Sequence, residues 1–185
     1  MDEMWALANK IDTSVAHPAR RYNWLLGGKD NFEEDRKSGM LLESVSGSAR
    51  VTAVENRRFL KRAVTFVAEA GIDQFLDIGT GLPTADNTHE VAQRVAPESR
   101  IVYVDNDPLV LVHARALLTS SSEGETAYID SNVEDPERIL REAARTLDFT
   151  QPVALTMIGI LGNVADYAQA RAIVGRLLDA VPSGS

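Results

Sequence analysis

The sequence lacks cysteine, so it can form no disulfide bond, thiolate nucleophile or cysteine-bound metal site. Positive charge is also scarce, because 19 Lys and Arg residues are outnumbered by 27 Asp and Glu residues, which leaves a net charge of −8. A chain this acidic is a poor partner for nucleic acid, whose phosphates need a basic surface. We therefore expect no nucleic-acid partner, although a local basic patch stays open.

Long apolar runs are absent as well. The longest one, around Pro152–Leu161, is far shorter than the ~20 residues that span a bilayer. The N-terminal run Met-Asp-Glu-Met-Trp has no basic start before an apolar stretch, so it does not resemble a signal peptide. We expect a cytoplasmic protein with no membrane partner, and a reducing cytosol suits a chain without cysteine.

Histidine is rare, and His17, His89 and His113 show no spacing typical of metal ligands. No serine-centred nucleophile elbow and no P-loop lysine is present. We therefore expect no metal site. His89 follows a glycine-rich turn and is a candidate for a role near a ligand, whereas helix packing is the alternative reading for each histidine.

The chain length of 185 residues fits about one domain, and its second part alternates strands with helices. The first strong amphipathic pattern covers residues 54–70; before it, residues 1–53 are polar and irregular, with short helices expected at Pro18–Leu25 and Asn31–Val45. The expected strands are Gln74–Ile78, Arg100–Val104, Glu125–Asp130 and Pro152–Leu161. Helices are expected at Thr84–Val95, Pro108–Leu118, Pro136–Leu147 and Asp166–Ala180. This alternation predicts an α/β fold with a doubly wound, mainly parallel sheet, and the wholly apolar fourth strand is expected at its centre.

Two glycines follow the first expected strand, in the run Leu76-Asp-Ile-Gly-Thr-Gly-Leu82. Parallel sheets bind ligands at the carboxyl ends of their strands, and Gly79 and Gly81 permit a tight turn and close backbone approach. A dinucleotide fingerprint would need a third glycine where Thr84 stands. Asp77 before the turn suits a cationic or zwitterionic ligand better than a pyrophosphate. An ordinary strand-to-helix turn is the alternative.

Polar side chains also follow the next two strands. Asp105 ends the second strand, 24 residues after Gly81, where an acid can accept hydrogen bonds from the two hydroxyls of a ribose. Asp107 is interpreted as a helix cap. The run Asp130–Val133 follows the third strand, where a carboxylate or amide can bind the amino group of an adenine ring. A solvated strand end and a polar turn are the alternatives for these two sites.

The N-terminal segment Arg20–Phe32 (RRYNWLLGGKDNF) combines both signs of charge with flat aromatic rings and a glycine pair. We interpret it as a lid over the ligand, with Tyr22 or Asp30 near the reacting atom. The alternative is a helical cap that packs against the sheet and leaves its charges solvated.

In this order, the motifs resemble the cofactor motifs of class I S-adenosylmethionine-dependent methyltransferases. The segment Arg20–Phe32, together with Asn56–Val64, Gln74–Thr84, Asn87–Gln93 and Val102–Pro108, is similar to one bacterial S-adenosyl methyltransferase family, long filed as a domain of unknown function. The resemblance covers nearly the whole chain. It implies a Rossmann-like methyltransferase sheet with S-adenosylmethionine as the cofactor.

The resemblance also implies roles for single residues. The methionine part would be held near Asp77, Gly79 and Gly81, the ribose by Asp105, and the adenine edge by residues 130–133. The full set of expected cofactor-binding residues is Asp77, Gly79, Thr80, Gly81, Asp105, Asn106, Asp130, Ser131, Asn132 and Val133.

Two departures from the family pattern follow. The family usually carries Asp where Asn132 stands, so adenine binding is expected to be weakened rather than lost. A full fold of this class continues beyond residue 185 with an antiparallel hairpin, so we expect the C-terminal strands to be missing and one sheet edge to be open. An open edge allows a homodimer.

The sequence thus favours a methyltransferase that acts on a small molecule through in-line displacement at the methyl carbon. A general base is optional, since a sulfonium is already a strong leaving group, and Tyr22, Asp30 and His89 are the candidates for one. Two alternatives stay open: a non-catalytic protein that binds S-adenosylmethionine or S-adenosylhomocysteine, and an NAD-dependent oxidoreductase.

Overall fold

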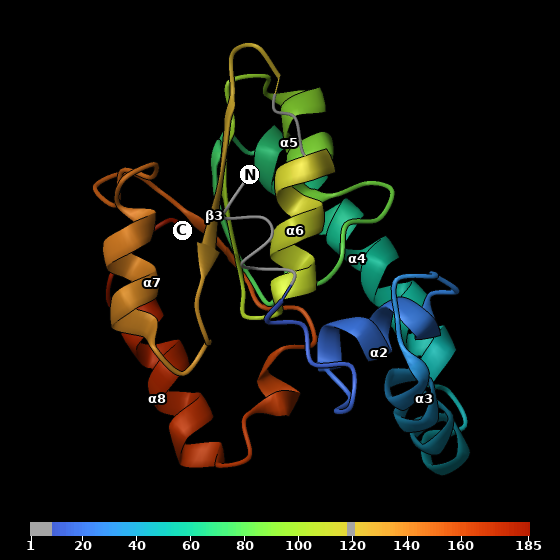
Figure 1. The fold of residues 1–185 in the computed structure, drawn as a ribbon. Helices are drawn as coiled ribbons and strands as arrows, with labels where there is room; N and C mark the ends of the chain where they lie inside the picture. The colour runs from blue at the N-terminus through green and yellow to red at the C-terminus, as the bar shows by residue number, and fades with distance from the viewer. Residues whose placement is uncertain (1–8, 118–120) are drawn as a thin grey trace.

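A parallel sheet of four strands forms the centre of the protein, which the computed structural model describes for residues 9–117 and 121–185 (Figure 1). The strands are β1 Gln74–Ile78, β2 Arg100–Asp105, β3 Glu125–Asp130 and β4 Ala154–Thr156. Their order is β3-β2-β1-β4, and every neighbouring pair is parallel. The order reverses between β1 and β4, which is the switch point where doubly wound sheets bind ligands.

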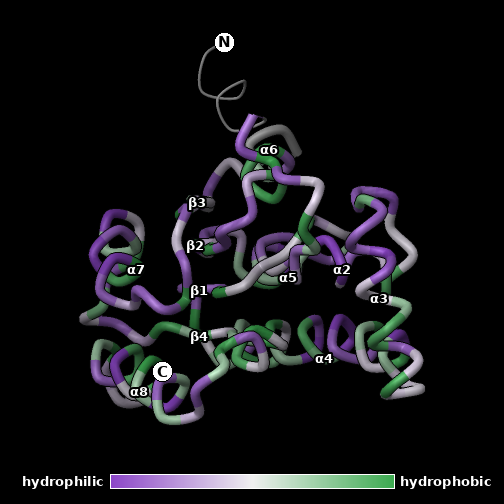
Figure 2. Tube along the Cα trace, turned by 60° about the horizontal axis from the view of Figure 1, so that its bottom comes forward, coloured by the Kyte–Doolittle hydropathy of each residue, from purple (hydrophilic) through white to green (hydrophobic). Residues whose placement is uncertain are grey.

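Helices cover both faces of this sheet. The described helices are α2 Pro18–Leu25, α3 Glu33–Ser46, α4 Ala49–Glu69, α5 Thr88–Val95, α6 Pro108–Leu117, α7 Pro136–Ala143 and α8 Tyr167–Leu178, with a short 3-10 turn at Leu161–Asn163. One face carries α4, α5 and α6, and the opposite face carries α7 and α8 (Figure 2). The predicted doubly wound α/β fold is therefore confirmed.

Side-chain alternation along the strands divides the core between these two faces. Leu76 and Ile78 of β1 belong to a buried cluster with Ile139 of α7 and Leu177 of α8. Phe75, which points to the opposite face, belongs to a second cluster on the side of α4 and α5. Because β1 is buried along its whole length, the residue after Leu76 on the second face, Asp77, is a buried acid.

The N-terminal helices form the predicted helical cap. Leu25 of α2 packs on Ala49 and Ala53 of α4. The ring of Trp24 lies on Gly39 of α3, where an added Cβ would come within 2.3 Å of the ring. Helices α2 and α3 are therefore joined to the start of α4, and the expected boundary between residues 53 and 54 falls inside α4.

The fourth strand differs from its prediction, since it is only three residues long and lies at the edge of the described sheet rather than at its centre. Pro152 has no N–H to donate to a strand ladder, and Gly159 adopts a left-handed conformation with φ of 82°. These two residues limit the extended segment on either side. Apolar composition alone predicted a longer central strand.

Three helix boundaries also differ from those that the sequence pattern predicts. Helix α4 begins at Ala49 rather than 54, directly after Gly47 ends α3 in a left-handed conformation. Helix α5 begins at Thr88 rather than 84, because Asp86 has a φ of 59° that no helix can include. Helix α7 ends at Ala143 rather than 147. Within the described part of the chain, no helix is long and apolar enough to cross a membrane.

Candidate functional site

A pocket of about 270 Å³ lies at the carboxyl ends of the four strands. Its floor comes from the segments after β1 and β2, and its side walls come from the segments after β3 and β4. Residues of α2 and α4 also line it, so the N-terminal cap contributes directly. This position at the reversal of strand order is the expected ligand site of a doubly wound sheet.

The turn after β1 depends on two glycines in the left-handed region, Gly79 with φ of 76° and Gly81 with φ of 66°. At Gly79 an added Cβ would lie 2.6 Å from the Cβ of Ile160, which follows β4. At Gly81 no atom lies within 4 Å of such a Cβ. Gly79 therefore allows close packing of two loops, whereas Gly81 leaves open space beside the pocket.

Asp105, at the end of β2, joins two loops through one buried carboxylate. Its Oδ2 accepts a hydrogen bond from the backbone N–H of Gly81 at 2.8 Å, and its Oδ1 accepts one from the N–H of Asp107 at 3.0 Å. Burial raises the pKa of Asp105, and the two backbone N–H groups act against this rise. The carboxylate lines the pocket, and each oxygen has lone-pair capacity left for ligand hydroxyls.

Asp77, at the end of β1, is held by two hydroxyl donors. Thr88 of α5 donates to Oδ2 at 2.6 Å, and Thr156 of β4 donates to Oδ1 at 2.8 Å. Burial raises the pKa of Asp77, while these hydroxyls and the charge of Arg57 lower it. The result is a fixed acid below the glycine turn, suited to bind a cationic group.

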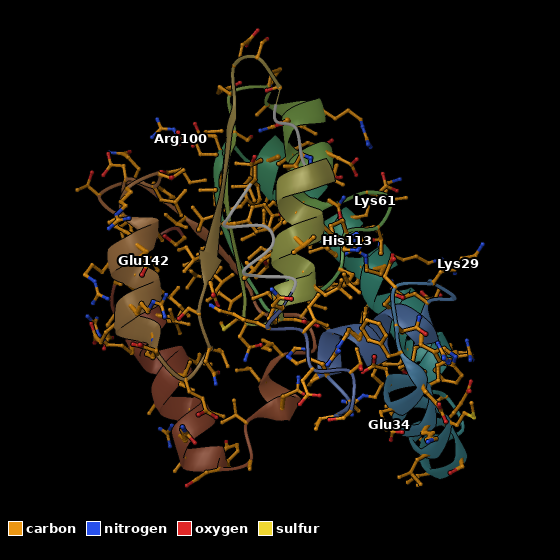
Figure 3. All side chains as sticks on the ribbon, viewed as in Figure 1. Lys29, Glu34, Lys61, Arg100, His113 and Glu142 are labelled. Carbon is orange, nitrogen blue, oxygen red and sulfur yellow. The ribbon has the colours of Figure 1, made fainter. Side chains whose placement is uncertain are left out.

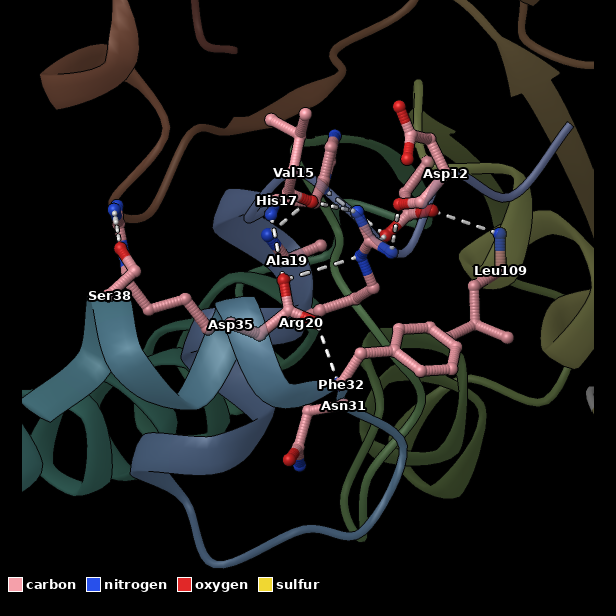
Figure 4. Close-up of polar contacts among 12 residues, drawn as sticks. Asp12, Val15, His17, Ala19, Arg20, Asn31, Phe32, Asp35, Ser38 and Leu109 are labelled. Atoms are coloured by element: carbon pink, nitrogen blue, oxygen red, sulfur yellow. Dashed lines mark hydrogen bonds and ion pairs between the residues drawn. The ribbon is translucent and has the colours of Figure 1, made fainter.

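A buried ion-pair cluster attaches the N-terminal segment to the loop after β2 (Figure 4). Nε of Arg20 lies 3.3 Å from Oδ2 of Asp107 and 3.6 Å from Oδ1 of Asp35. Nδ1 of His17 lies 3.2 Å from the same Asp107 oxygen. Asp107 also accepts from the N–H of Leu109 at 3.0 Å, which confirms its role as the cap of α6. This cluster places residues 17–22 against the pocket.

Most of the predicted cofactor residues come together in this pocket. Nine of the ten line it, and these are Asp77, Gly79, Thr80, Gly81, Asp105, Asn106, Ser131, Asn132 and Val133. Asp130 ends β3 with an exposed side chain and is not among the lining residues. Asp130 is paired in register with Asp105 of β2. It differs from Asp105 because β3 is the outer strand of the sheet.

Of the three candidates for a general base, only Tyr22 lines the pocket. Its hydroxyl donates to the carbonyl of Ala53 at 2.9 Å, and burial raises its pKa. His89 is buried outside the lining, where its Nδ1 and backbone N lie 2.8 Å and 2.7 Å from the hydroxyl of Tyr103. Asp30 is exposed and lies 3.7 Å from His113.

The glycine pair of the N-terminal segment also lies outside the pocket lining. Gly28 packs against the side chain of Asn23, which an added Cβ would approach to 2.3 Å. Asn31 donates to the Asn23 side chain and to the Gly28 carbonyl, both at 2.9 Å. Lys29 projects away from the protein (Figure 3). The pair therefore shapes a turn, and residues 17–22 form the part that borders the ligand space.

The sequence patterns missed several lining residues. Asn56 and Arg57 come from α4, and Ile158–Ile160 come from the segment after β4. Asn56 and Arg57 lie three and four residues after the buried Ala53 and again before Leu60, so they border the apolar stripe of the helix. This position was a usable signal. The apolar run ending at Leu161 instead indicated a longer strand.

The combined donor set suits a nucleoside joined to an amino acid. Two buried acids stand at neighbouring strand ends, the guanidinium of Arg57 lines the same pocket, and apolar side chains such as Leu60 and Val164 complete the walls. An ammonium, a ribose and a flat base each find a complementary group here. Among the described residues, no cluster of acids and histidines is arranged to hold a metal ion.

Comparisons with known proteins agree with this geometry. A family model described as S-adenosyl methyltransferase matches residues 4–185, so the chain belongs to the S-adenosyl methyltransferase family. The structure is similar to that of a DUF574 family protein from Streptomyces avermitilis MA-4680, with a TM-score of 0.90 and 51% identity over 95% of this chain. It is also similar to a proposed methyltransferase from Thermobifida fusca YX, with a TM-score of 0.84 and 45% identity over 92% of this chain.

This chain spans 68% of the Streptomyces protein and 64% of the Thermobifida protein, or about two thirds of each. No curated protein matches it.

Proposed function

We propose that the chain binds S-adenosylmethionine in the pocket at the strand ends and transfers its methyl group to a small-molecule acceptor. The observation that carries this proposal is the pair of buried carboxylates, Asp77 and Asp105, on either side of the glycine turn. The family membership supports the same cofactor.

Each group in the pocket has a separate task in this proposal. Asp77 accepts hydrogen bonds from the ammonium, and Asp105 accepts them from the ribose hydroxyls. Val133 and the neighbouring backbone border the adenine. Bound S-adenosylmethionine supplies an electrophilic methyl group on a positively charged sulfur. The protein positions this group and excludes water, which can supply much of the rate enhancement for an in-line displacement.

A small acceptor fits the charge of the chain. The net charge of −8 disfavours nucleic-acid substrates. Tyr22 borders the pocket from the N-terminal cap, and its raised pKa together with the donation of its hydroxyl proton to the Ala53 carbonyl makes it unsuited to act as a base. The cap would then cover the reacting atoms.

Calorimetric titration with S-adenosylmethionine, S-adenosylhomocysteine and NAD tests the cofactor. We expect micromolar binding of the first two, a loss of at least ~10-fold in Asp105→Ala, and no comparable binding of NAD. Preferential binding of NAD, or no binding by a folded chain, would contradict the proposal. An acceptor screen that detects S-adenosylhomocysteine release then separates a methyltransferase from a protein that only binds the cofactor.

A further inference from the structure

Arg57 is a charged pocket residue that forms no ion pair within the described part of the chain. Its Nη2 donates to the carbonyls of Ala85 at 3.4 Å and Asp86 at 3.2 Å. Among the residues that the structure describes, no carboxylate lies within ion-pair distance of its guanidinium. Arginine keeps its charge at every accessible pH, so this half-buried cation has capacity for an anionic ligand group.

The loop before α5 holds this guanidinium in place. Asp86 adopts a left-handed backbone conformation with φ of 59°, which is uncommon for a residue other than glycine. Its carboxylate pairs with Lys61 of α4 at 2.8 Å and with Arg94 of α5 at 3.3 Å. These two contacts fix the loop between the helices. The loop carbonyls then hold one edge of the Arg57 guanidinium and leave the other nitrogens for a further acceptor.

Arg57 and Asp77 together present opposite charges at one end of the pocket. Both line it, and the charge of Arg57 is close enough to lower the pKa of Asp77. An α-amino acid carries an ammonium and a carboxylate on the same carbon atom. Such a group therefore complements an acid and a guanidinium that line the same pocket.

We propose that Arg57 binds the carboxylate of the amino-acid end of S-adenosylmethionine while Asp77 binds its ammonium. This inference rests on the proposed function, because it names residues within the same site. A guanidinium suits the task since its planar donors match a carboxylate. A carboxylate on the methyl acceptor is the other source of the same chemistry, and the experiment separates the two.

The test compares S-adenosylmethionine with decarboxylated S-adenosylmethionine by calorimetry, in the wild-type chain and in Arg57→Gln. We expect Arg57→Gln to weaken binding of S-adenosylmethionine by ~10- to 100-fold. The affinity of Arg57→Gln for the decarboxylated compound should stay within about 2-fold of the wild-type affinity or exceed it. Arg58→Gln is the matched control, because this neighbour on α4 is exposed and pairs with Glu55. It should leave both affinities unchanged.

Several outcomes would overturn the inference. Equal losses for both compounds would mean that Arg57 only stabilises the loop. Unchanged affinity for both would exclude the cofactor carboxylate and direct attention to the acceptor. If Arg57→Gln does not fold, Arg57→Lys keeps the charge but not the planar donors, and it should weaken only S-adenosylmethionine. Failure of the wild-type chain to bind S-adenosylmethionine at all would instead contradict the proposed function.

Discussion

Asp77 shows at the scale of one residue how a binding site can reduce stability. Burial raises its pKa above the value of an unfolded aspartate, so between these two values the folded state binds more protons than the unfolded state. The contribution of Asp77 is therefore favourable at low pH and is lost as pH rises through its folded-state pKa. At pH values above its folded-state pKa, Asp77 is a buried charge that lowers the stability of the fold.

We therefore predict that Asp77→Asn raises the free energy of unfolding at pH 7 and above, and that it weakens S-adenosylmethionine binding by at least ~10-fold. Denaturant melts at several pH values and calorimetry would measure both effects. The exposed Asp148 offers a control, because its pKa is lowered by hydrogen bonds from Thr150. If Asp77→Asn loses stability at every pH, the hydroxyl contacts outweigh the buried charge.

The contribution of His89 to stability changes with pH in the opposite direction to that of Asp77. Burial lowers its pKa, so its neutral form stabilises the fold above the unfolded value of ~6.5. That contribution is lost as pH falls through the folded-state pKa. We predict that His89→Gln flattens the pH dependence of unfolding below ~6.5 without altering S-adenosylhomocysteine affinity, as measured by denaturant melts and calorimetry. A large loss of affinity would instead place His89 in the binding machinery.

The site could be predicted in part from the sequence, residue by residue. Asp77 and Asp105 stand directly after apolar runs, so their position at strand ends could be read without a structure. Asp130 fits the same pattern, yet its side chain points to solvent because β3 is the outer strand. Arg57 lies with Asn56 and Leu60 on α4, far in sequence from the strand ends that form the rest of the site, and the packing of α4 brings these residues to the pocket.

Among the elements, the glycine turn after β1 and the loop after β4 restrict each other. We predict that Gly81→Ala costs ~1–2 kcal/mol for its left-handed backbone alone. Gly79→Ala should cost ~1–3 kcal/mol more, because its Cβ would meet Ile160. Denaturant melts of both variants measure this difference. Adding Ile160→Ala to Gly79→Ala should recover part of the additional loss, and no recovery would show that the contact is not the cause.

The attachment of α2 to the loop after β2 depends on buried charges. We predict that Arg20→Gln destabilises the fold by ~3–5 kcal/mol, because Asp107 and Asp35 are left buried with one partner fewer. Lys37→Gln is the control, since its pairs with Glu33 and Glu34 are exposed, and it should leave stability nearly unchanged. Thermal melts and limited proteolysis within residues 9–32 would compare them, and similar losses would contradict the buried anchor.

Helix starts that carry a capping acid or a proline were predictable from the sequence, whereas the starts of α4 and α5 were not. Asp135 and Asp166 each cap the helix that follows, and Pro18, Pro108 and Pro136 each open a helix, so local chemistry set those boundaries. The bounds of β4 were missed because its apolar composition hid the limits that Pro152 and Gly159 set.

For the whole molecule, ligand binding and folding are linked. A ligand present at 100 times its Kd, and bound only by the folded state, adds ~2.7 kcal/mol to the free energy of unfolding. For a chain of this size we predict a rise in Tm of roughly 5–10 °C with saturating S-adenosylhomocysteine. Arg57→Gln should reduce that rise while keeping the unliganded Tm close to wild type, and an unchanged rise would contradict its role.

The order of the strands in the sheet also affects the order in which they can pair during folding. Residues of β1, β2 and β3 lie between 74 and 130 along the chain, and each pairs with the next one made. Strand β1 gains its second neighbour only when Ala154 of β4 pairs with Phe75. Since loop closure over longer separations is slower, a growing chain can assemble the pocket residues that follow β1, β2 and β3 first. The wall that contains Ile158–Ile160 is added when β4 joins the sheet, so the pocket is complete only at that point.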